Sequence, residues 1–366
     1  MYIHEIEDWY KFRYDADKLI RPVADVRLLQ GKLISKIHGL GLDAVNAASL
    51  AEMSENLLKS SEIEGQILNC ESVRSSVARR LGLDIAGLNV FDRNIDGMVE
   101  VMFDATHNCF RPLTKERLCG WQASLFPSGY SGMYKIEPGK YRSGLMQVVS
   151  GAFGREKIHF EAPDASRVND EMKIFLEWAN SESQTDEVLK AAIAHFWFIT
   201  IHPFDDGNGR VARTIADMFL ARSDREPRRF YSMSRQIALE KNAYYEALKT
   251  AQLGDGEITS WLLWFCECLA RAISNSDNLL SRTLSKAKFW QNHSQIILNE
   301  RQKKMINLLF DDFFGKLTTS KWAKITKTSN DTALRDIKDL VEKDILKKED
   351  AGGRSANYTL RNDIPS

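Results

Sequence analysis

The sequence predicts a mainly helical protein with one small β-hairpin inserted in it and a winged helix-turn-helix region near its C-terminal end. Three observations indicate this fold class. The 366 residues include only 8 prolines, long stretches carry apolar residues at three- and four-residue steps, and one glycine-rich stretch, 127–163, loses that period. A content of 43% hydrophobic and 27% charged residues is typical of a globular chain with a sizeable core.

The helical pattern begins in a lead segment, residues 1–40, and continues from 42 to about 83, where Gly82 and Gly87 mark its end. The glycine-rich stretch predicts a loop and then a hairpin with strands at 146–149 and 157–160. Further helices are expected near 93–107, 114–125, 168–181, 186–201, 207–221, 236–252 and 258–284.

The composition shifts near Lys286. Beyond it, helices are expected at 302–314, 319–327 and 332–346, followed by two short strands within 347–360 around Gly352 and Gly353. A helix, a helix-turn-helix and a hairpin in this order predict a winged helix.

The overall charge favours no particular class of partner, because 50 basic residues balance 50 acidic ones. The five cysteines are irregularly spaced and are expected to be reduced, buried thiols. The acidic N-terminus lacks a signal-peptide pattern, and the most apolar window, 261–273, is too short to span a bilayer. A cytoplasmic location is the expectation.

The strongest functional signal is the string HPFDDGNGRVAR at 202–213. One helix is expected to end at its histidine, and the next to begin at Gly207-Asn208-Gly209. The first N–H groups of a helix lack intrahelical partners and lie at the positive end of its dipole, so they form an anion site. Glycines there let phosphate oxygens approach the backbone.

The charged side chains of this string complete a phosphate-binding site. Arg210 and Arg213 lie near one face of the helix and can hold phosphates with two hydrogen bonds each. Asp206, just before the cradle, can bind Mg²⁺ that bridges two phosphates. His202 can accept a proton from an attacking hydroxyl. The parts suit a nucleotide transfer but do not specify which phosphorus is attacked.

The string resembles the Fic family pattern HPFx(D/E)GNGRxxR at every specified position. The resemblance extends to GKYR at 139–142, to the hairpin up to Pro163, which is similar to the family's flap at about 142–163, and to NAYYEAL at 242–248. It covers roughly residues 50–285. It implies transfer of AMP from the substrate ATP to a hydroxyl of a target protein, with release of pyrophosphate and with Mg²⁺ as cofactor.

The resemblance also implies roles for single residues. His202 would be the general base and Asp206 the metal ligand, while an anion hole and distal-phosphate contacts would come from Gly207, Asn208, Gly209, Arg210 and Arg213. The flap around Ile158, His159 and Phe160 would align the target backbone by strand addition. Tyr244 and Tyr245 would lie by the adenosine; Gln252 stands where a relative has an adenosine-contacting asparagine.

A second signature lies upstream. Ser60 to Gly65 fit the family's inhibitory pattern (S/T)xxxE(G/N), within an expected inhibitory helix at about 55–66. Ser60 and Glu64 share a helix face. A charge on Glu64 can pair with Arg213 and withhold it from the γ-phosphate. Glu62 is the rival for this role, but it faces another side.

Three segments are therefore expected: 1–45, a helical segment without assigned chemistry; 46–285, the Fic domain; and 286–366, the winged helix. The leading function is a self-inhibited protein adenylyltransferase, with a homodimer as one expected assembly. Alternatives are a de-AMPylase, a transferase of another nucleotide, or a nucleotide-sensing DNA-binding regulator. DNA binding is not favoured over protein docking, because the charges of 332–346 nearly cancel. His195 is expected to be a core residue.

Overall fold

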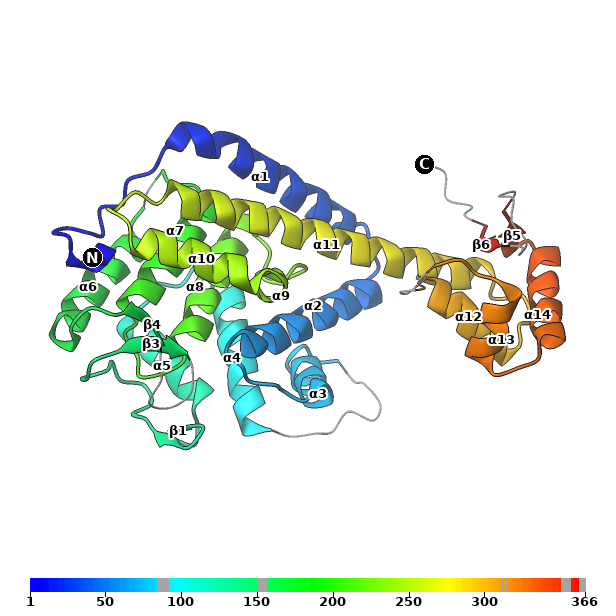
Figure 1. Cartoon of the computed structure of the whole chain (residues 1–366), viewed down its shortest axis with the longest axis horizontal. Coiled ribbons are helices and arrows are strands. Elements are labelled where there is room, and N and C mark those ends of the chain that lie inside the picture. Colours follow the sequence, from blue (N-terminus) through cyan, green and yellow to red (C-terminus); the bar gives the residue numbers. More distant parts are fainter. Residues whose placement is uncertain are drawn as a thin grey trace. The chain divides into compact units, whose positions relative to one another are not determined.

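The computed structural model describes residues 1–83, 92–150, 157–182, 184–310, 313, 315–349 and 357–361. Helices dominate, which confirms the predicted fold class (Figure 1). The contacts divide the chain into two compact units, Met1–Asp277 and Asn278–Ser366. The first unit joins the expected segment 1–45 to the expected Fic domain, and the expected boundary at 286 lies eight residues beyond the division, inside a continuous helix.

The first unit is a helical bundle with short strand pairs on its surface. Its helices are α1 (Ala16–His38), α2 (Leu42–Ile63), α3 (Cys70–Arg80), α4 (Arg93–His107), α5 (Lys115–Leu125), α6 (Val168–Asn180), α7 (Glu187–Ile201), α8 (Asn208–Asp224), α9 (Met233–Leu239), α10 (Lys241–Gln252) and the larger part of α11 (Thr259–Asn292). Its strands pair as antiparallel hairpins: β1 (Tyr130–Ser131) with β2 (Tyr134–Lys135), and β3 (Gln147–Ser150) with β4 (Lys157–Glu161).

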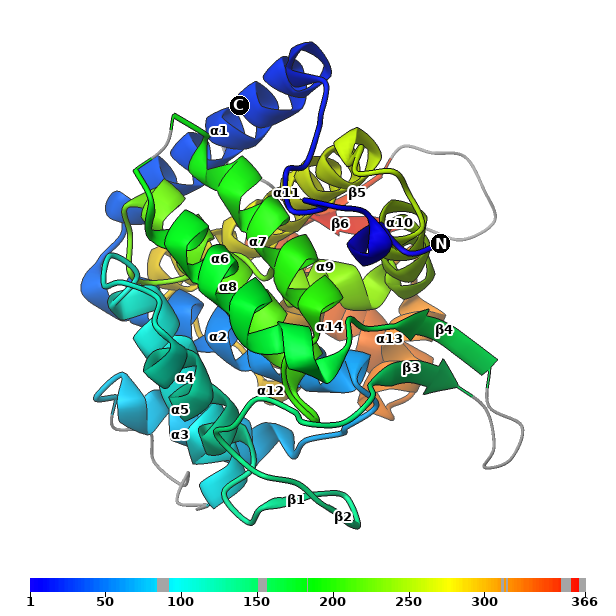
Figure 2. The same ribbon diagram turned by 90° about the vertical axis from the view of Figure 1, so that its left-hand side faces the viewer.

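Helices α7 and α8 lie side by side in the middle of this unit (Figure 2). Helix α7 is apolar around most of its circumference and is buried from Lys190 to Ile201, as expected of a helix with neighbours on every side. His195 lies in this buried run, which confirms its prediction as a core residue. The loop between α7 and α8 therefore has a rigid support at both ends.

The helical region expected at 42–83 is two helices, and the break determines where Glu64 lies. Helix α2 ends at Ile63, Glu64 caps it, and Gly65 takes a left-handed φ of +79°. A left-handed glycine just past a helix end allows the next N–H groups to satisfy the last carbonyls. Helix α3 then begins behind the Asn69 cap. Glu64 thus stands at the end of an element that packs on α8.

The hairpin β3–β4 confirms the predicted strands. Val148 pairs with Phe160 and Val149 with Ile158, with a register shift between the two pairs. Its connecting residues, 151–156, which include Gly151 and Gly154, lie outside the described residues. Figure 2 shows the hairpin at the edge of the unit, away from the α7–α8 pair.

The second unit has the predicted order of elements: α12 (Glu300–Phe310), α13 (Thr319–Thr326), α14 (Asn330–Glu342), and the antiparallel pair β5 (Leu346–Lys348) and β6 (Tyr358–Leu360). Helix α14 ends four residues before its predicted end, and residues 311, 312 and 314, at the predicted end of α12, lie outside the described residues. A separate apolar cluster around Trp322, Ile337 and Leu340 forms its core. Gly352, Gly353 and Arg354 lie outside the described residues.

The five cysteines are free thiols, and four of them are buried or half-buried. The prediction of buried thiols is wrong for Cys70, which is exposed because it occupies the first position of α3 on the surface. No helix in the described part of the chain combines the length and the apolar character needed to cross a bilayer.

Candidate active site

The loop between α7 and α8 is held in shape by Asn208. Its side-chain Oδ1 accepts the Phe204 N–H at 2.9 Å and its Nδ2 donates to the Phe204 carbonyl at 2.7 Å. The side-chain amide of Asn208 therefore binds both the N–H and the carbonyl of one residue, as the backbone of a neighbouring β-strand would. Its side chain is occupied inside the loop, so any anion contact by Asn208 falls to its backbone N–H.

His202 is oriented for proton acceptance. It ends α7 in a left-handed conformation, with φ of +52°, and its Nδ1 lies 3.0 Å from the Ile199 carbonyl. Because a carbonyl only accepts, the hydrogen belongs on Nδ1, and Nε2 keeps a lone pair. Burial lowers the pKa of His202 below its ordinary 6.5, which keeps the ring neutral near pH 7.

Asp206 has donors on both carboxylate oxygens. Its Oδ1 accepts the Gly207 N–H at 2.5 Å, and its Oδ2 accepts the hydroxyl of Ser131 from β1. The described residues contain no group of three or more His, Cys, Asp or Glu side chains arranged to hold a metal. A half-buried single carboxylate with spare lone pairs fits Mg²⁺, which in nucleotide sites takes one or two carboxylates, substrate phosphates and water.

Both arginines of the string are buried and engaged by the segment at the end of α2. Arg213 is 4% exposed, and its Nη1 lies 2.8 Å from Glu64 Oε1. Its Nε and Nη2 donate to the hydroxyl and the carbonyl of Ser60 at 3.0 and 2.8 Å. Arg210 donates to Gln66 Oε1 at 3.2 Å and lies over the ring of Phe126. The guanidinium of Arg213 thus contacts Ser60 and Glu64, which lie one turn apart at the end of α2.

The carboxylate of Glu64 lies against the backbone at the start of α8. A Cβ on Gly209 would fall 2.1 Å from Glu64 Oε1, so only glycine permits this approach. Gly207, with φ of +87°, is equally constrained, since a Cβ there would meet the Phe126 ring at 2.9 Å. An anionic group thus occupies the N-terminal end of α8, where helix geometry favours anions.

Arg142 links the loop to the base of the flap, and the sequence analysis assigned it no role. It is 4% exposed and donates to the carbonyls of His202, Gly144 and Pro163 at 2.8, 2.9 and 2.5 Å. Its own N–H donates to the carbonyl of Pro203 at 2.8 Å. Its place in the GKYR stretch could have indicated a role for Arg142. Only the fold shows that this side chain holds the backbone beside His202.

The tentative adenosine residues differ in exposure. Tyr244 is 2% exposed, and its hydroxyl lies 3.0 Å from His195 Nε2. Gln252 is also buried and donates to the Thr200 hydroxyl at 3.3 Å. Tyr245 is the surface member of the set. An adenosine contact in this arrangement falls to Tyr245, whereas Tyr244 and Gln252 support the wall behind it.

The three flap residues also differ in exposure. Ile158 and His159 are exposed, as strand addition would require. Phe160 is buried against the rings of Tyr2 and His4 in the N-terminal segment. Phe160 therefore anchors the flap to the N-terminal segment, whereas Ile158 and His159 stay exposed beside a register shift in the hairpin.

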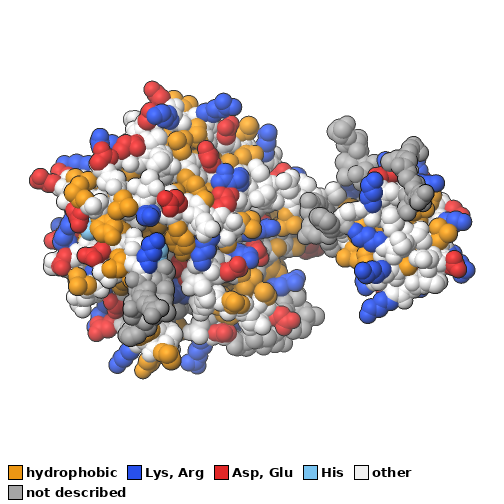
Figure 3. Space-filling view, viewed as in Figure 1, with side chains coloured by type: hydrophobic (Ala, Val, Ile, Leu, Met, Phe, Trp, Pro, Cys, Tyr) orange, Lys and Arg blue, Asp and Glu red, His pale blue; other side chains and the backbone are white. Residues whose placement is uncertain are grey.

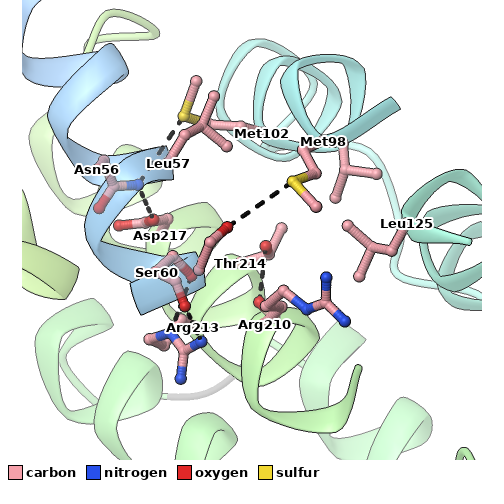
Figure 4. Close-up of a pocket in the computed structure, with 12 residues that line it drawn as sticks. Asn56, Leu57, Ser60, Met98, Met102, Leu125, Arg210, Arg213, Thr214 and Asp217 are labelled. Atoms are coloured by element: carbon pink, nitrogen blue, oxygen red, sulfur yellow. Dashed lines mark hydrogen bonds between the residues drawn. The ribbon is translucent and has the colours of Figure 1, made fainter. Parts of the chain in front are cut away.

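A small cavity of about 30 Å³ lies between α2, α4 and α8 (Figure 4). Figure 4 shows Ser60 and Arg213 turned toward each other at its edge, with Asn56 and Asp217 joined by a hydrogen bond deeper in. Ligand pockets measure about 300–1,000 Å³, so this cavity has room for water and not for a nucleotide. Glu64 lies on the other side of Arg213 from this cavity's Asn56 and Asp217.

Comparison with known sequences places this loop in a family. A model described as "Fic/DOC family" matches residues 112–220, and one described as "Domain of unknown function (DUF4172)" matches residues 2–83. The second match runs through the expected boundary at 45 and includes the whole of α2. The described site therefore combines residues from both matched regions.

Curated relatives match over short stretches. A protein adenylyltransferase fic-1 of Caenorhabditis elegans is 37% identical over 91 residues, which are 24% of this chain and 16% of that protein. A protein adenylyltransferase Fic of Drosophila yakuba is 34% identical over 104 residues, 28% of this chain and 19% of that protein. The matched stretch thus spans less than a quarter of the length of these relatives.

Solved structures show the same fold. A Fic family protein from Desulfovibrio desulfuricans aligns with a TM-score of 0.52 at 18% identity, covering 95% of this chain and 97% of that one. A Fic domain containing signaling protein from Bacteroides thetaiotaomicron aligns with a TM-score of 0.54 at 19% identity, covering 70% and 97%. The motif, the loop geometry, the family model and these folds agree: residues 112–220 of this chain form a Fic/DOC domain.

Proposed function

We propose that this protein transfers AMP from ATP to a hydroxyl side chain of a target protein, and that Glu64 inhibits the reaction within the same chain. The observation that carries the proposal is the carboxylate of Glu64 on the N-terminal end of α8 beside Arg213. It supports an anion site at this position whose occupant in the resting chain is a side chain. The names of the curated relatives, protein adenylyltransferase, support the choice of reaction.

Each residue of the site has a separate role in such a transfer. Nε2 of His202 accepts the proton of the target hydroxyl as its oxygen attacks the α-phosphorus of ATP. The bond from that phosphorus to the bridging oxygen breaks, and pyrophosphate leaves with the electron pair. The N–H groups at the start of α8 and the guanidinium groups of Arg210 and Arg213 bind the phosphates and stabilise the added negative charge.

Asp206 would hold Mg²⁺ at the phosphates, and when bound the ion would neutralise part of the charge on the leaving pyrophosphate. Ser131 and the Gly207 N–H orient the carboxylate for this contact. The exposed edge of the flap, at Ile158 and His159, would position the backbone of the target by strand addition.

Inhibition follows from competition for one guanidinium. Arg213 cannot bind the γ-phosphate while it pairs with Glu64, and a phosphate at Gly209 would meet the Glu64 carboxylate as a like charge. ATP would then bind in a non-productive position or weakly. The inhibition requires only that α2 stays packed against α8.

The test uses the full chain with α-labelled ATP and a cell extract as a source of targets. Replacing Glu64→Gly is expected to raise the incorporation of label by at least about tenfold, the equivalent of one charge pair. Adding His202→Ala should abolish incorporation. Supplying GTP, CTP or UTP in place of ATP should leave the protein fraction unlabelled.

A matched control is Glu62→Gly on the same turn of α2. Glu62 is exposed and pairs with Lys59 at 2.6 Å, away from Arg213, so this change should leave incorporation at the level of the unmodified chain. Equal labelling by the unmodified chain and the Glu64 variant would refute self-inhibition. Labelling with a different nucleotide alone would refute the assignment of ATP.

A further inference from the structure

We propose that the C-terminal unit, Asn278–Ser366, binds duplex DNA through the exposed face of α14 and the neighbouring cations of α13 and β5. This inference does not depend on the reaction proposed for the first unit. It rests on charge, on which acids are paired, and on the shape of the exposed helix.

The charge of the chain is unevenly distributed between its two units. From Asn278 to Ser366 the sequence has 17 Lys and Arg against 11 Asp and Glu, although the whole chain is neutral. The second unit therefore carries an excess of positive charge that the total conceals. Figure 3 shows Lys and Arg side chains gathered on the visible face of this unit. Such an asymmetry favours a polyanionic partner.

Two of the acids of α14 add no free negative charge to its exposed face, because each is paired within the unit. Asp336 is 5% exposed, and its carboxylate accepts two hydrogen bonds from Arg301 of α12, at 2.7 and 2.9 Å. Asp339 is paired with Lys343 at 2.6 Å and with Gln302 at 2.7 Å. Both acids are thus neutralised within the unit.

Six cations at the end of α13, on α14 and on β5 are left at the surface. They are exposed, and within the described residues no carboxylate lies within ion-pair distance of any of them, because the ion pairs of this unit involve other cations. They come from the end of α13, from α14 and from β5: Lys324, Lys327, Arg335, Lys338, Lys347 and Lys348. The acids left exposed on α14 are Asp331 and Glu342, one near each end.

The shape of α14 suits the major groove. Its inner face, with Ala333, Ile337 and Leu340, packs into the core of the unit, and its outer face carries Arg335 and Lys338. A left-handed residue, Lys327, and the Ser329 cap separate it from α13, which gives a helix-turn-helix. Thirteen residues make a helix of about 20 Å, long enough to cross the groove.

Two observations favour DNA over other macromolecules. Large hydrophobic side chains are not exposed on α13, α14, β5 or β6 in the described part of the unit, whereas a protein interface needs an apolar core. The major groove of double-stranded RNA is too narrow to admit a helix. Cations around a free helix face match B-form DNA, in which phosphates flank a groove of helix width.

The experiment measures fluorescence anisotropy of a labelled 25-base-pair duplex of mixed sequence, titrated with the full-length protein at several salt concentrations. We expect binding at low salt, with log affinity falling linearly against log salt. The double change Arg335→Glu and Lys338→Glu should weaken binding by at least about tenfold and reduce the salt slope by about 2.

The matched control is Lys303→Glu with Lys304→Glu on α12, which alters the net charge equally at exposed positions outside the proposed face. It should bind nearly as the unmodified protein does. Circular dichroism shows whether both variants keep their helices. The proposal is overturned if the duplex does not bind at 50 mM salt, if both double variants lose affinity equally, or if RNA of the same length binds more tightly than DNA.

Discussion

His202 combines three local properties that suit the proposed role of a base: a left-handed backbone, an Nδ1 held by the Ile199 carbonyl, and burial that disfavours the charged ring. Each comes from its place at the end of a buried helix. The same residue after an exposed helix would keep an ordinary pKa and a free tautomer. The chemistry of the site is thus set by the packing of α7.

The lowered pKa of His202 predicts the acid limb of the pH profile. The ring acts as a base when neutral, so the acid limb of kcat/KM for the Glu64→Gly variant should be centred below pH 6.5. The same direction means that the contribution of this ring to stability is present above 6.5 and is lost on acidification. Steady-state rates across pH 5–8 test it; an acid limb centred above 6.5 would contradict it.

Arg142 fixes backbone carbonyls that belong to different segments. Arg142→Ala leaves those buried acceptors unpaired, and the free energy of unfolding should fall by about 3 kcal/mol or more. Arg142→Lys keeps the charge but loses the planar fork, so it should recover less than half of that loss. Urea denaturation of the two variants measures both values, and full recovery with lysine would refute the geometric explanation.

At this scale the sequence predicted one contiguous string and the pairing of Glu64 with Arg213, because a motif and an i,i+4 face are local properties. It did not predict Arg142 as a support or Ser131 as a partner of Asp206. Their contacts join positions 60 and 75 residues apart in the chain, and such distances leave no period in the sequence.

Helix α2 is the element on which regulation would depend, and polar groups hold it. Asn56 donates to Asp217 of α8 at 3.0 Å and accepts the Ser232 hydroxyl at 2.7 Å. One turn away Glu52 is buried, facing Ser276 of α11 and Arg235 of α9. Burial raises the pKa of Glu52 to about 7.

This raised pKa makes stability depend on pH in a defined direction. The unfolded chain ionises Glu52 near 4.5, whereas the folded chain does so near 7, so the contribution is complete below 4.5 and is lost as the pH rises to about 7. The difference amounts to about 3 kcal/mol. Glu52→Gln should flatten the unfolding free energy over this range, measured by urea titration.

Glu55→Gln is the control for that change, since Glu55 lies one turn further along α2 and is half-buried, 4.0 Å from Arg235. It should leave the pH dependence in place. An unchanged slope in the Glu52 variant would show that another buried group is responsible.

Periodicity predicted most helices, because their apolar spacing is set within each segment. Glycine-rich turns predicted the hairpins within 146–160 and 347–360. The end of α2 before Glu64 was not predicted, because the sequence does not distinguish a glycine that caps a helix from a glycine within one. The depth of Tyr244 and Gln252 was missed for a different reason: their burial comes from α7, more than 40 residues away in the chain.

The whole molecule consists of two units with separate apolar cores. We therefore expect two transitions in calorimetric unfolding. Trp322 is fully buried in the second core, and Trp322→Ala should lower the stability of that unit alone by about 3–5 kcal/mol. The transition of the first unit should not move, and a single shared shift would show that the units unfold together.

The division into units also explains why the total composition concealed the positive charge of the second unit. Equal numbers of acids and bases describe a chain that is neutral only on average, and the excess of one unit is hidden by the other. Assigning each charge to its unit, and then to its ion pair, requires the fold.

The carboxylate at the start of α8 has a consequence for how this protein would respond to its cell. An inhibitor carried on the same chain is present at a fixed effective concentration, commonly of millimolar order for tethered groups. Diluting the protein cannot release it, and ordinary changes in ATP compete with it poorly. Activity would then depend on a binding event that moves the end of α2 away from Arg213. The enzyme would respond to such an event more than to the concentration of ATP.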